Sequence, residues 1–258
     1  MKAYLHLEDG SVYEGESFGS DLAAYGEVVF STGMTGYCES LTDPSYAGQI
    51  LTFTYPLIGN YGVPKPRVRE RHLMENFESE HIWTKGVICS EASVTFSEWL
   101  VSHKVPGILG IDTRSLTQKI RDHGVMRGLI SLSKRTPSWE KFPVEELVPM
   151  VSTKTVIVYK PAKPNGKHVV LLDCGVKHGI LRALLTRGYH VTRIPWDEDP
   201  LKVNRIDGVV GSNGPGDPKD CKKTIENIRR VIARDIPFLG ICLGHQLLAL
   251  AIGADTYK

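Results

Sequence analysis

The feature that most constrains the fold is a regular alternation of apolar and amphipathic segments in residues 168–258. Short apolar runs, each long enough for one strand, are separated by longer stretches with apolar residues at helical spacing. The apolar runs are 168–172, 189–194, 207–211 and 237–241, and the helical stretches are 179–187, 222–234 and 243–252. Strands that alternate with helices predict a parallel sheet joined by right-handed crossovers and flanked by helices on both faces.

Residues 1–150 carry a different pattern, which predicts a mixed α+β domain. The turn pair Asp9–Gly10 follows alternating apolar residues and precedes Val12, a combination that indicates a β-hairpin. Further strands are expected at 26–31, 49–55, 86–90 and 125–132, and helices at 97–104 and 113–122. Gly124 is expected to end the second helix.

Between the two patterns lies a stretch without apolar periodicity. Residues 160–167 contain two prolines, one glycine and three lysines. This composition is typical of a linker. The sequence therefore predicts an N-terminal domain over 1–150, a linker over 151–167 and an α/β domain over 168–258.

Composition excludes several classes of protein. The 31 basic and 29 acidic residues give a net charge of +2, which offers no basis for binding nucleic acid or an anionic membrane surface. The five cysteines are odd in number and include no C-x-x-C pair, which argues against a disulfide framework or a zinc site. No apolar run approaches the length of a membrane span, and no signal peptide is evident. A cytoplasmic protein is expected.

Cys242 lies where the apolar run 237–241 gives way to a helix, in the sequence Gly-Ile-Cys-Leu-Gly. This arrangement matches a nucleophile elbow built around cysteine. The positive end of the helix dipole favours the thiolate. Gly240 and Gly244 are expected where the strand and helix backbones cross too closely for side chains.

The carboxyl ends of parallel strands share one edge of a sheet, where ligands usually bind. The loop 212–218 and the Cys242 turn should therefore lie together. The backbone N–H of Leu243, with that of Gly214 or Gly216, is expected to form an oxyanion hole for an attacked carbonyl.

Other interpretations were weighed against this one. An arbitrary cysteine at a strand end is usually a small buried residue. His245, one helical turn after the thiol, is expected to have a packing or supporting role, because triad bases usually come from a separate loop. Cys242 and His245 alone make no metal site. The run from Gly211 to Gly216 resembles the start of a P-loop but lacks its Lys-Ser/Thr, so ATP or NAD binding by this chain is not expected.

Taken together, these motifs resemble the class I glutamine amidotransferases, and among them the glutaminase chain of glutamine-dependent carbamoyl-phosphate synthetase. The likeness extends along the whole chain. It rests on the segments Gly33–Tyr37, Leu41–Ile50, Tyr55–Gly62, Gly110–Arg114, Asp173–Lys177, Ser212–Pro218 and Gly240–Gln246.

The resemblance implies that Cys242 attacks the side-chain amide of L-glutamine, releasing ammonia and leaving a γ-glutamyl thioester for hydrolysis. It implies glutamine contacts from Ser45, Gly214, Gly216, Leu243 and Gln246, with Ser45 contributed by the first domain. It also implies a partner, either a large synthetase subunit or a fused synthetase domain, that uses bicarbonate, ATP and Mg²⁺. No cofactor is expected in this chain.

Two departures from the family pattern matter. Gly179 stands where the family usually has Asn. The family's catalytic His and Glu lie beyond the position of Lys258, so the sequence is expected to be a C-terminally truncated glutaminase with impaired activity. A docking and ammonia-channelling partner without glutaminase activity is the main alternative. Another amidotransferase or a cysteine hydrolase with a similar elbow is a third reading, which the N-terminal segments weaken.

Overall fold

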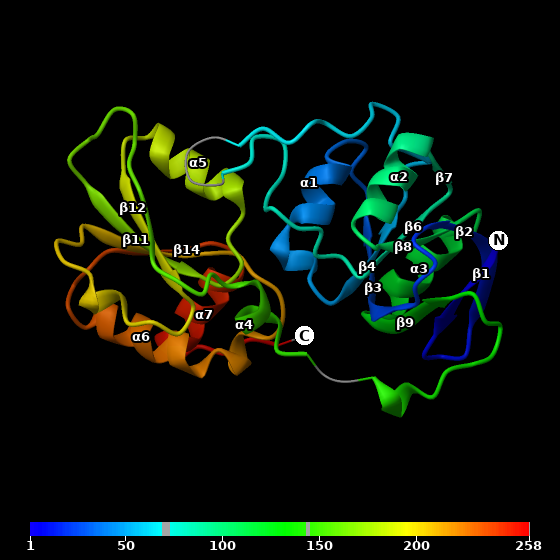
Figure 1. The fold of residues 1–258 in the computed structure, drawn as a ribbon. Coiled ribbons are helices and arrows are strands. Elements are labelled where there is room, and N and C mark those ends of the chain that lie inside the picture. The colour runs from blue at the N-terminus through cyan, green and yellow to red at the C-terminus, as the bar shows by residue number, and fades with distance from the viewer. Residues whose placement is uncertain (69–72, 143–144, 258) are drawn as a thin grey trace. The chain divides into compact units, whose positions relative to one another are not determined.

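The computed structural model describes residues 1–68, 73–142 and 145–257 and divides the chain into two compact units (Figure 1). The first unit consists of Met1–Pro66 and Glu80–Glu145, and the second of Arg67–Ser79 and Glu146–Lys258. Each unit has its own hydrophobic core. Within the described ranges, no helix combines the length and apolar character needed to cross a bilayer.

A closed barrel of seven strands forms the first unit. In the order of hydrogen-bonded neighbours, its strands are β1 (Lys2–Leu7), β2 (Val12–Gly19), β8 (Pro106–Leu109), β6 (Gly86–Cys89), β4 (Gln49–Phe53), β3 (Ala24–Ser31) and β9 (Met126–Ser131). Neighbours from β3 through β4 and β6 to β8 are parallel, and the other pairs are antiparallel. The predicted hairpin is confirmed, because β1 and β2 pair antiparallel around Gly10, whose φ is 88°. Strand β8 was not predicted.

Short elements and three helices complete this unit. They are α1 (Tyr37–Thr42), η1 (Pro44–Tyr46), β5 (Leu57–Ile58), β7 (Glu91–Ala92), α2 (Val94–Ser102), α3 (Thr113–His123) and η3 (Trp139–Lys141). Helix α2 begins earlier than predicted because the Ser93 hydroxyl accepts the Phe96 N–H at 3.3 Å and so caps the helix. Helix α3 ends before Gly124, as predicted, and that glycine has φ 82°.

One hydrophobic cluster ties the barrel to α3. Alternate β1 residues Ala3, Leu5 and Leu7 are at most 1% exposed, and Leu116 and Ile120 of α3 join the same cluster. Because successive strand residues point to opposite faces, every second β1 side chain enters this core.

The second unit is a five-stranded sheet flanked by helices. Its strands, in spatial order, are β10 (Ile157–Tyr159), β12 (His190–Pro195), β11 (His168–Asp173), β13 (Gly208–Gly211) and β14 (Phe238–Gly240). Only β10 pairs antiparallel, with β12; the remaining pairs are parallel, as predicted. The accompanying helical elements are α4 (Leu147–Val151), α5 (His178–Thr186), η4 (Pro200–Lys202), η5 (Pro218–Asp220), α6 (Lys222–Ile232) and α7 (Leu243–Ala251).

Helices cover both faces of this sheet, with α5 on one side and α6 and α7 on the other (Figure 1). Val170 and Leu172 of β11 belong to the cluster that includes α6 and α7, whereas Val169 and Leu171 belong to the cluster that includes α5. A continuous apolar strand results, because both of its faces are buried.

The structure differs from the predicted linker. Residues 147–151 form α4 and residues 157–159 form β10, so the longer segment of the second unit begins at Glu146 and includes most of the predicted linker. The pattern missed β10 because three residues at an edge, with Val158 37% exposed, show no clear alternation. Residues 152–156 and the stretch between β10 and β11 keep the character of a loop.

A segment from the first half of the sequence also belongs to the second unit. We call residues 73–79 the strap. Leu73 is 2% exposed and lies in the core cluster that contains Val169 and Leu181. The Met74 N–H donates to Nδ1 of His178 at 3.0 Å. The strap has no helical or strand period, so only the folded structure assigns it to this unit.

His178 makes the stability of the second unit sensitive to acid. Burial, together with the nearby positive charges of Arg193 and Arg182, lowers its pKa from 6.5 to about 3. As pH falls below 6.5, the His178 imidazole becomes protonated in the unfolded chain. In the folded chain it stays neutral until near pH 3. This group alone should therefore lower the free energy of unfolding by about 2 kcal/mol between neutral pH and pH 5.

Urea unfolding of the natural protein and of His178→Gln at these two pH values measures this effect. The Gln variant should lose less stability on acidification, because it has no ionisable imidazole there. His245→Gln, which alters an exposed histidine, is the control. An equal loss in all three proteins would contradict the assignment.

Candidate active site

Cys242 occupies a sharp turn between a strand and a helix. It directly precedes α7, and its backbone has φ 52° and ψ −111°, outside the regions that L-residues normally adopt. Its side chain is exposed. Strained backbone at an exposed reactive residue is the geometry of a nucleophile elbow, so the predicted turn is confirmed as a local structure.

Glycines make this turn possible, as predicted from the sequence. A Cβ on Gly244 would lie 2.2 Å from the Gly211 carbonyl oxygen, and a Cβ on Gly240 would lie 2.5 Å from the Gly244 oxygen. The Gly244 N–H donates to the Ser212 oxygen at 2.9 Å, and the Ile241 N–H donates to the Gly211 oxygen at 2.9 Å. The end of β13 and the start of α7 are thus joined backbone to backbone.

The thiol lies at the N-terminus of a nine-residue helix. The first N–H groups of a helix have no acceptors within it, and the helix dipole places partial positive charge there. The other four cysteines are buried, and burial raises the pKa of Cys38 and of Cys221 to about 12 and raises that of Cys89 and Cys174 as well.

The loop after β13 lies against the elbow. A Cβ on Gly214 would be 2.9 Å from Cδ2 of Leu243 and 2.0 Å from the carbonyl oxygen of Cys174. Gly216 has φ 84° and packs instead beside Leu147 of α4. Of the two glycines predicted for the oxyanion hole, Gly214 is therefore the one that the described contacts bring to Leu243.

A buried carboxylate organises the neighbouring loop after β11. Asp173 is fully buried, and its Oδ1 accepts the N–H groups of Gly175 and Val176 at 2.9 and 2.8 Å. Its Oδ2 accepts the Thr153 N–H at 2.7 Å and pairs with the Arg193 guanidinium at 2.6 Å. Burial by itself lowers the pKa of Arg193, but the attraction of Asp173 raises it overall. Such a buried charge is tolerated because donors surround it.

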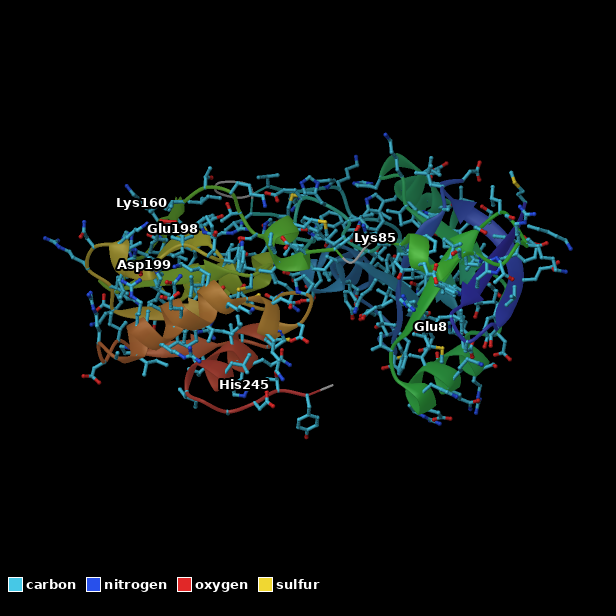
Figure 2. All side chains as sticks on the ribbon, turned by 90° about the horizontal axis from the view of Figure 1, so that it is seen from below. Glu8, Lys85, Lys160, Glu198, Asp199 and His245 are labelled. Carbon is cyan, nitrogen blue, oxygen red and sulfur yellow. The ribbon has the colours of Figure 1, made fainter. Side chains whose placement is uncertain are left out.

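The remaining predicted site residues have different outcomes. Gln246 is exposed on α7, and its N–H donates to the Cys242 oxygen at 3.1 Å. His245 is also exposed, so the expected packing role is not observed (Figure 2). Ser45 lies in η1 of the first unit, where its N–H donates to Asp43 Oδ1 at 2.9 Å. Its predicted contact with glutamine stays a prediction.

The site contains residues to which sequence reasoning assigned no role. Ser212 accepts the Cys174 N–H at 2.9 Å, and Asn213 accepts the Lys177 N–H at 3.1 Å and donates to the Gly175 oxygen at 2.9 Å. Both side chains are at most 2% exposed. Their position in the sequence could have indicated such a role, because they directly follow a buried parallel strand and ligands bind at the carboxyl ends of such strands.

Two further observations limit what this region can hold. A groove of about 700 Å³ runs beside β13, β14 and α5, but Cys242 does not line it. Among the residues that the structure describes, no cluster of three or more His, Cys, Asp or Glu side chains could bind a metal.

The close approach of the Gly244 and Gly211 backbones can be tested by the substitution Gly244→Ala, which adds one methyl group. In Gly244→Ala the new Cβ meets backbone that cannot rotate away, so unfolding free energy should fall by about 1–3 kcal/mol and the thiol should shift. The matched control is Gly208→Ala in β13, where the nearest atom would lie 3.4 Å away. Urea unfolding and the alkylation rate of Cys242 report both effects. Equal behaviour of the two variants would refute the close crossing.

Comparison with known proteins is consistent along the chain. Residues 5–130 match the family described as carbamoyl-phosphate synthase small chain, CPSase domain, and residues 170–258 match glutamine amidotransferase class-I. The carbamoyl phosphate synthase small chain of Pyrococcus furiosus is 47% identical over 100% of this chain and 74% of its own length.

Two other relatives differ in organisation. The multifunctional protein pyr1-3 of Dictyostelium discoideum is 46% identical over 100% of this chain, which spans 13% of that protein. The carbamoyl phosphate synthase arginine-specific small chain of Neurospora crassa is 44% identical over 100% of this chain and 60% of its own length. The chain therefore belongs to the carbamoyl phosphate synthase small-chain family, and its residues 170–258 match the class I glutamine amidotransferases.

Proposed function

We propose that the protein is the glutamine-hydrolysing component of a carbamoyl phosphate synthase, supplying ammonia for carbamoyl phosphate synthesis. The observation that carries this proposal is the exposed Cys242 thiol in a strained turn at the start of α7. The loop containing Gly214, packed against Leu243, supports an acyl-transfer reaction rather than simple thiol packing.

In the proposed reaction, the Cys242 thiolate attacks the side-chain amide carbon of L-glutamine. The N–H groups of Leu243 and Gly214 or Gly216 stabilise the negative charge that develops on the amide oxygen. Collapse of this intermediate breaks the C–N bond, and the protonated nitrogen leaves as ammonia. Water then attacks the γ-glutamyl thioester, releases glutamate and regenerates the thiol.

Efficient turnover requires a base to move these protons. Within the part of the chain that the structure describes, no hydrogen bond joins the Cys242 thiol to an imidazole, and His245 projects from an exposed helix face. Because triad members act as a unit, the rate of glutamine hydrolysis depends on such a base.

The proposed substrate contacts are Ser45, Gly214, Gly216, Leu243 and Gln246. The proposed partner is a large synthetase subunit or a synthetase domain in the same polypeptide, and ATP and Mg²⁺ bind there. The near-neutral charge and the absence of a basic cluster in the sequence pattern support a cytoplasmic protein that binds neither nucleic acid nor membrane.

A glutamine-like electrophile tests the assembled pocket. A diazo-ketone analogue of norleucine should label Cys242 rapidly, and millimolar L-glutamine should slow this labelling by competition. Peptide mass spectrometry identifies the modified cysteine. The buried Cys89 and Cys221 serve as internal controls, because their raised pKa values disfavour the thiolate. Labelling of Cys242 no faster than of these two would reject an activated thiol.

Product formation tests the physiological role. Added to a synthetase partner, the natural full-length protein should support carbamoyl phosphate formation from glutamine, whereas Cys242→Ser should support it only from added ammonia. Ammonia-dependent activity checks that the variant still permits synthesis. If the natural protein, like Cys242→Ser, supports synthesis only from added ammonia, it acts only as a docking or channelling partner. If both support synthesis from glutamine, Cys242 is not the nucleophile.

A further inference from the structure

The strap carries a carboxylate that caps the start of α5. Oε2 of Glu78 accepts the Gly179 N–H at 2.7 Å, and the Glu78 carbonyl oxygen accepts the His178 N–H at 2.9 Å. Arg182 contacts the same carboxylate at 3.5 Å and donates to the Phe77 oxygen at 3.3 Å. A negative group at a helix N-terminus binds unpaired N–H groups and complements the helix dipole.

Gly179 leaves the space that this carboxylate occupies. A Cβ at position 179 would lie 3.1 Å from each Glu78 carboxylate oxygen. The Glu78 side chain is 16% exposed, so it extends from the strap onto the start of α5 rather than into solvent. A Cβ at 179 would therefore require the carboxylate to move by a few tenths of an ångström.

The residue before α5 connects this cap to the elbow loop. Lys177 immediately precedes His178, and its N–H donates to Oδ1 of Asn213 at 3.1 Å. The Asn213 amide in turn donates to the Gly175 oxygen at 2.9 Å. The loop after β11 and the loop after β13 are therefore clamped together by side chains that are almost fully buried.

The loop after β13 is in turn hydrogen-bonded to the turn that contains Cys242. The Ser212 carbonyl oxygen accepts the Gly244 N–H at 2.9 Å, and Gly214 lies too close to the Cys174 oxygen to accommodate any side chain. A displacement at the start of α5 would pass through Asn213 into the backbone that presents Gly214. Rigid, closely packed backbone transmits such shifts instead of absorbing them.

From this continuous set of contacts we infer that Glu78 is a positioning residue for glutamine hydrolysis: by capping α5 on Gly179, it fixes the Ser212–Gly214 loop against the Cys242 elbow. The inference rests on the proposed function for its catalytic meaning. It gives the strap, which comes from the first half of the sequence, a role in aligning the oxyanion donors.

Two alkylating reagents distinguish a loss of oxyanion-donor alignment from a general loss of Cys242 reactivity. A chloromethyl ketone built on the glutamine skeleton places its carbonyl oxygen in the oxyanion site while the Cys242 sulfur displaces chloride. Iodoacetamide alkylates the same sulfur by a direct displacement of iodide, which needs no oxyanion donor. In the natural full-length protein, Glu78→Ala should slow the chloroketone about tenfold and leave the iodoacetamide rate within about twofold.

Three matched variants sharpen this test. Glu78→Gln should recover most of the chloroketone rate, because its amide oxygen can still accept the Gly179 N–H. Gly179→Ala, which displaces the carboxylate slightly but keeps the backbone N–H, should slow the chloroketone less than Glu78→Ala does, and the double variant should be no slower than Glu78→Ala. Glu226→Ala, which removes an exposed carboxylate paired with Lys223 on α6 at 3.6 Å, should change neither rate.

Hydrogen exchange gives a readout that does not depend on glutamine chemistry. Amides of residues 212–216 should exchange faster in Glu78→Ala than in Glu226→Ala. Unchanged exchange there, or parallel slowing by both alkylating reagents, would overturn the inference. If the natural protein shows no glutamine protection of Cys242 while exchange responds as expected, the proposed function fails and the structural link from Glu78 to this loop stands.

Discussion

The second unit depends on one place where two backbones pass with no room for a side chain. The carbonyl oxygen of Gly211, at the end of β13, would lie 2.2 Å from any Cβ on Gly244 in the first turn of α7. This contact forces the chain to turn within one residue, and Cys242 takes the unfavourable φ of 52° as a result. The strain is held by the sheet on one side and by Leu243 and Leu247, both at most 1% exposed, on the other.

A second constraint is electrostatic. The fully buried Asp173 joins the end of β11 to Thr153 and to Arg193 of β12. Buried ion pairs add little net stability, but removing one partner leaves an uncompensated charge. Asp173 therefore acts mainly to specify one arrangement of the segment before β10 and of the loop after β11. That loop, in turn, holds Asn213 beside the elbow.

The strands and helices of the second unit could be predicted closely from sequence, because each has a strong local signal. β11 is apolar on both faces, and α6 places Ile225, Ile228 and Val231 at helical spacing toward the core. β10 was missed because it lies at the sheet edge without clear alternation, and β8 because it begins with Pro106 and Gly107, a pair typical of a turn. Sequence reasoning also placed the Cys242 turn correctly, since closely spaced glycines around a cysteine mark a backbone crossing.

The sequence by itself predicted the local turn: a cysteine at the start of a helix, next to glycines, after a short strand of a parallel sheet. Tertiary structure decided which groups surround it, bringing Gly214 rather than Gly216 to Leu243 and attaching the strap at Glu78 to α5. The physical reason is the range of the signals. Turns and periodicities arise from neighbours along the chain, whereas Glu78 and Gly179 are 101 residues apart and meet only when the whole unit has packed.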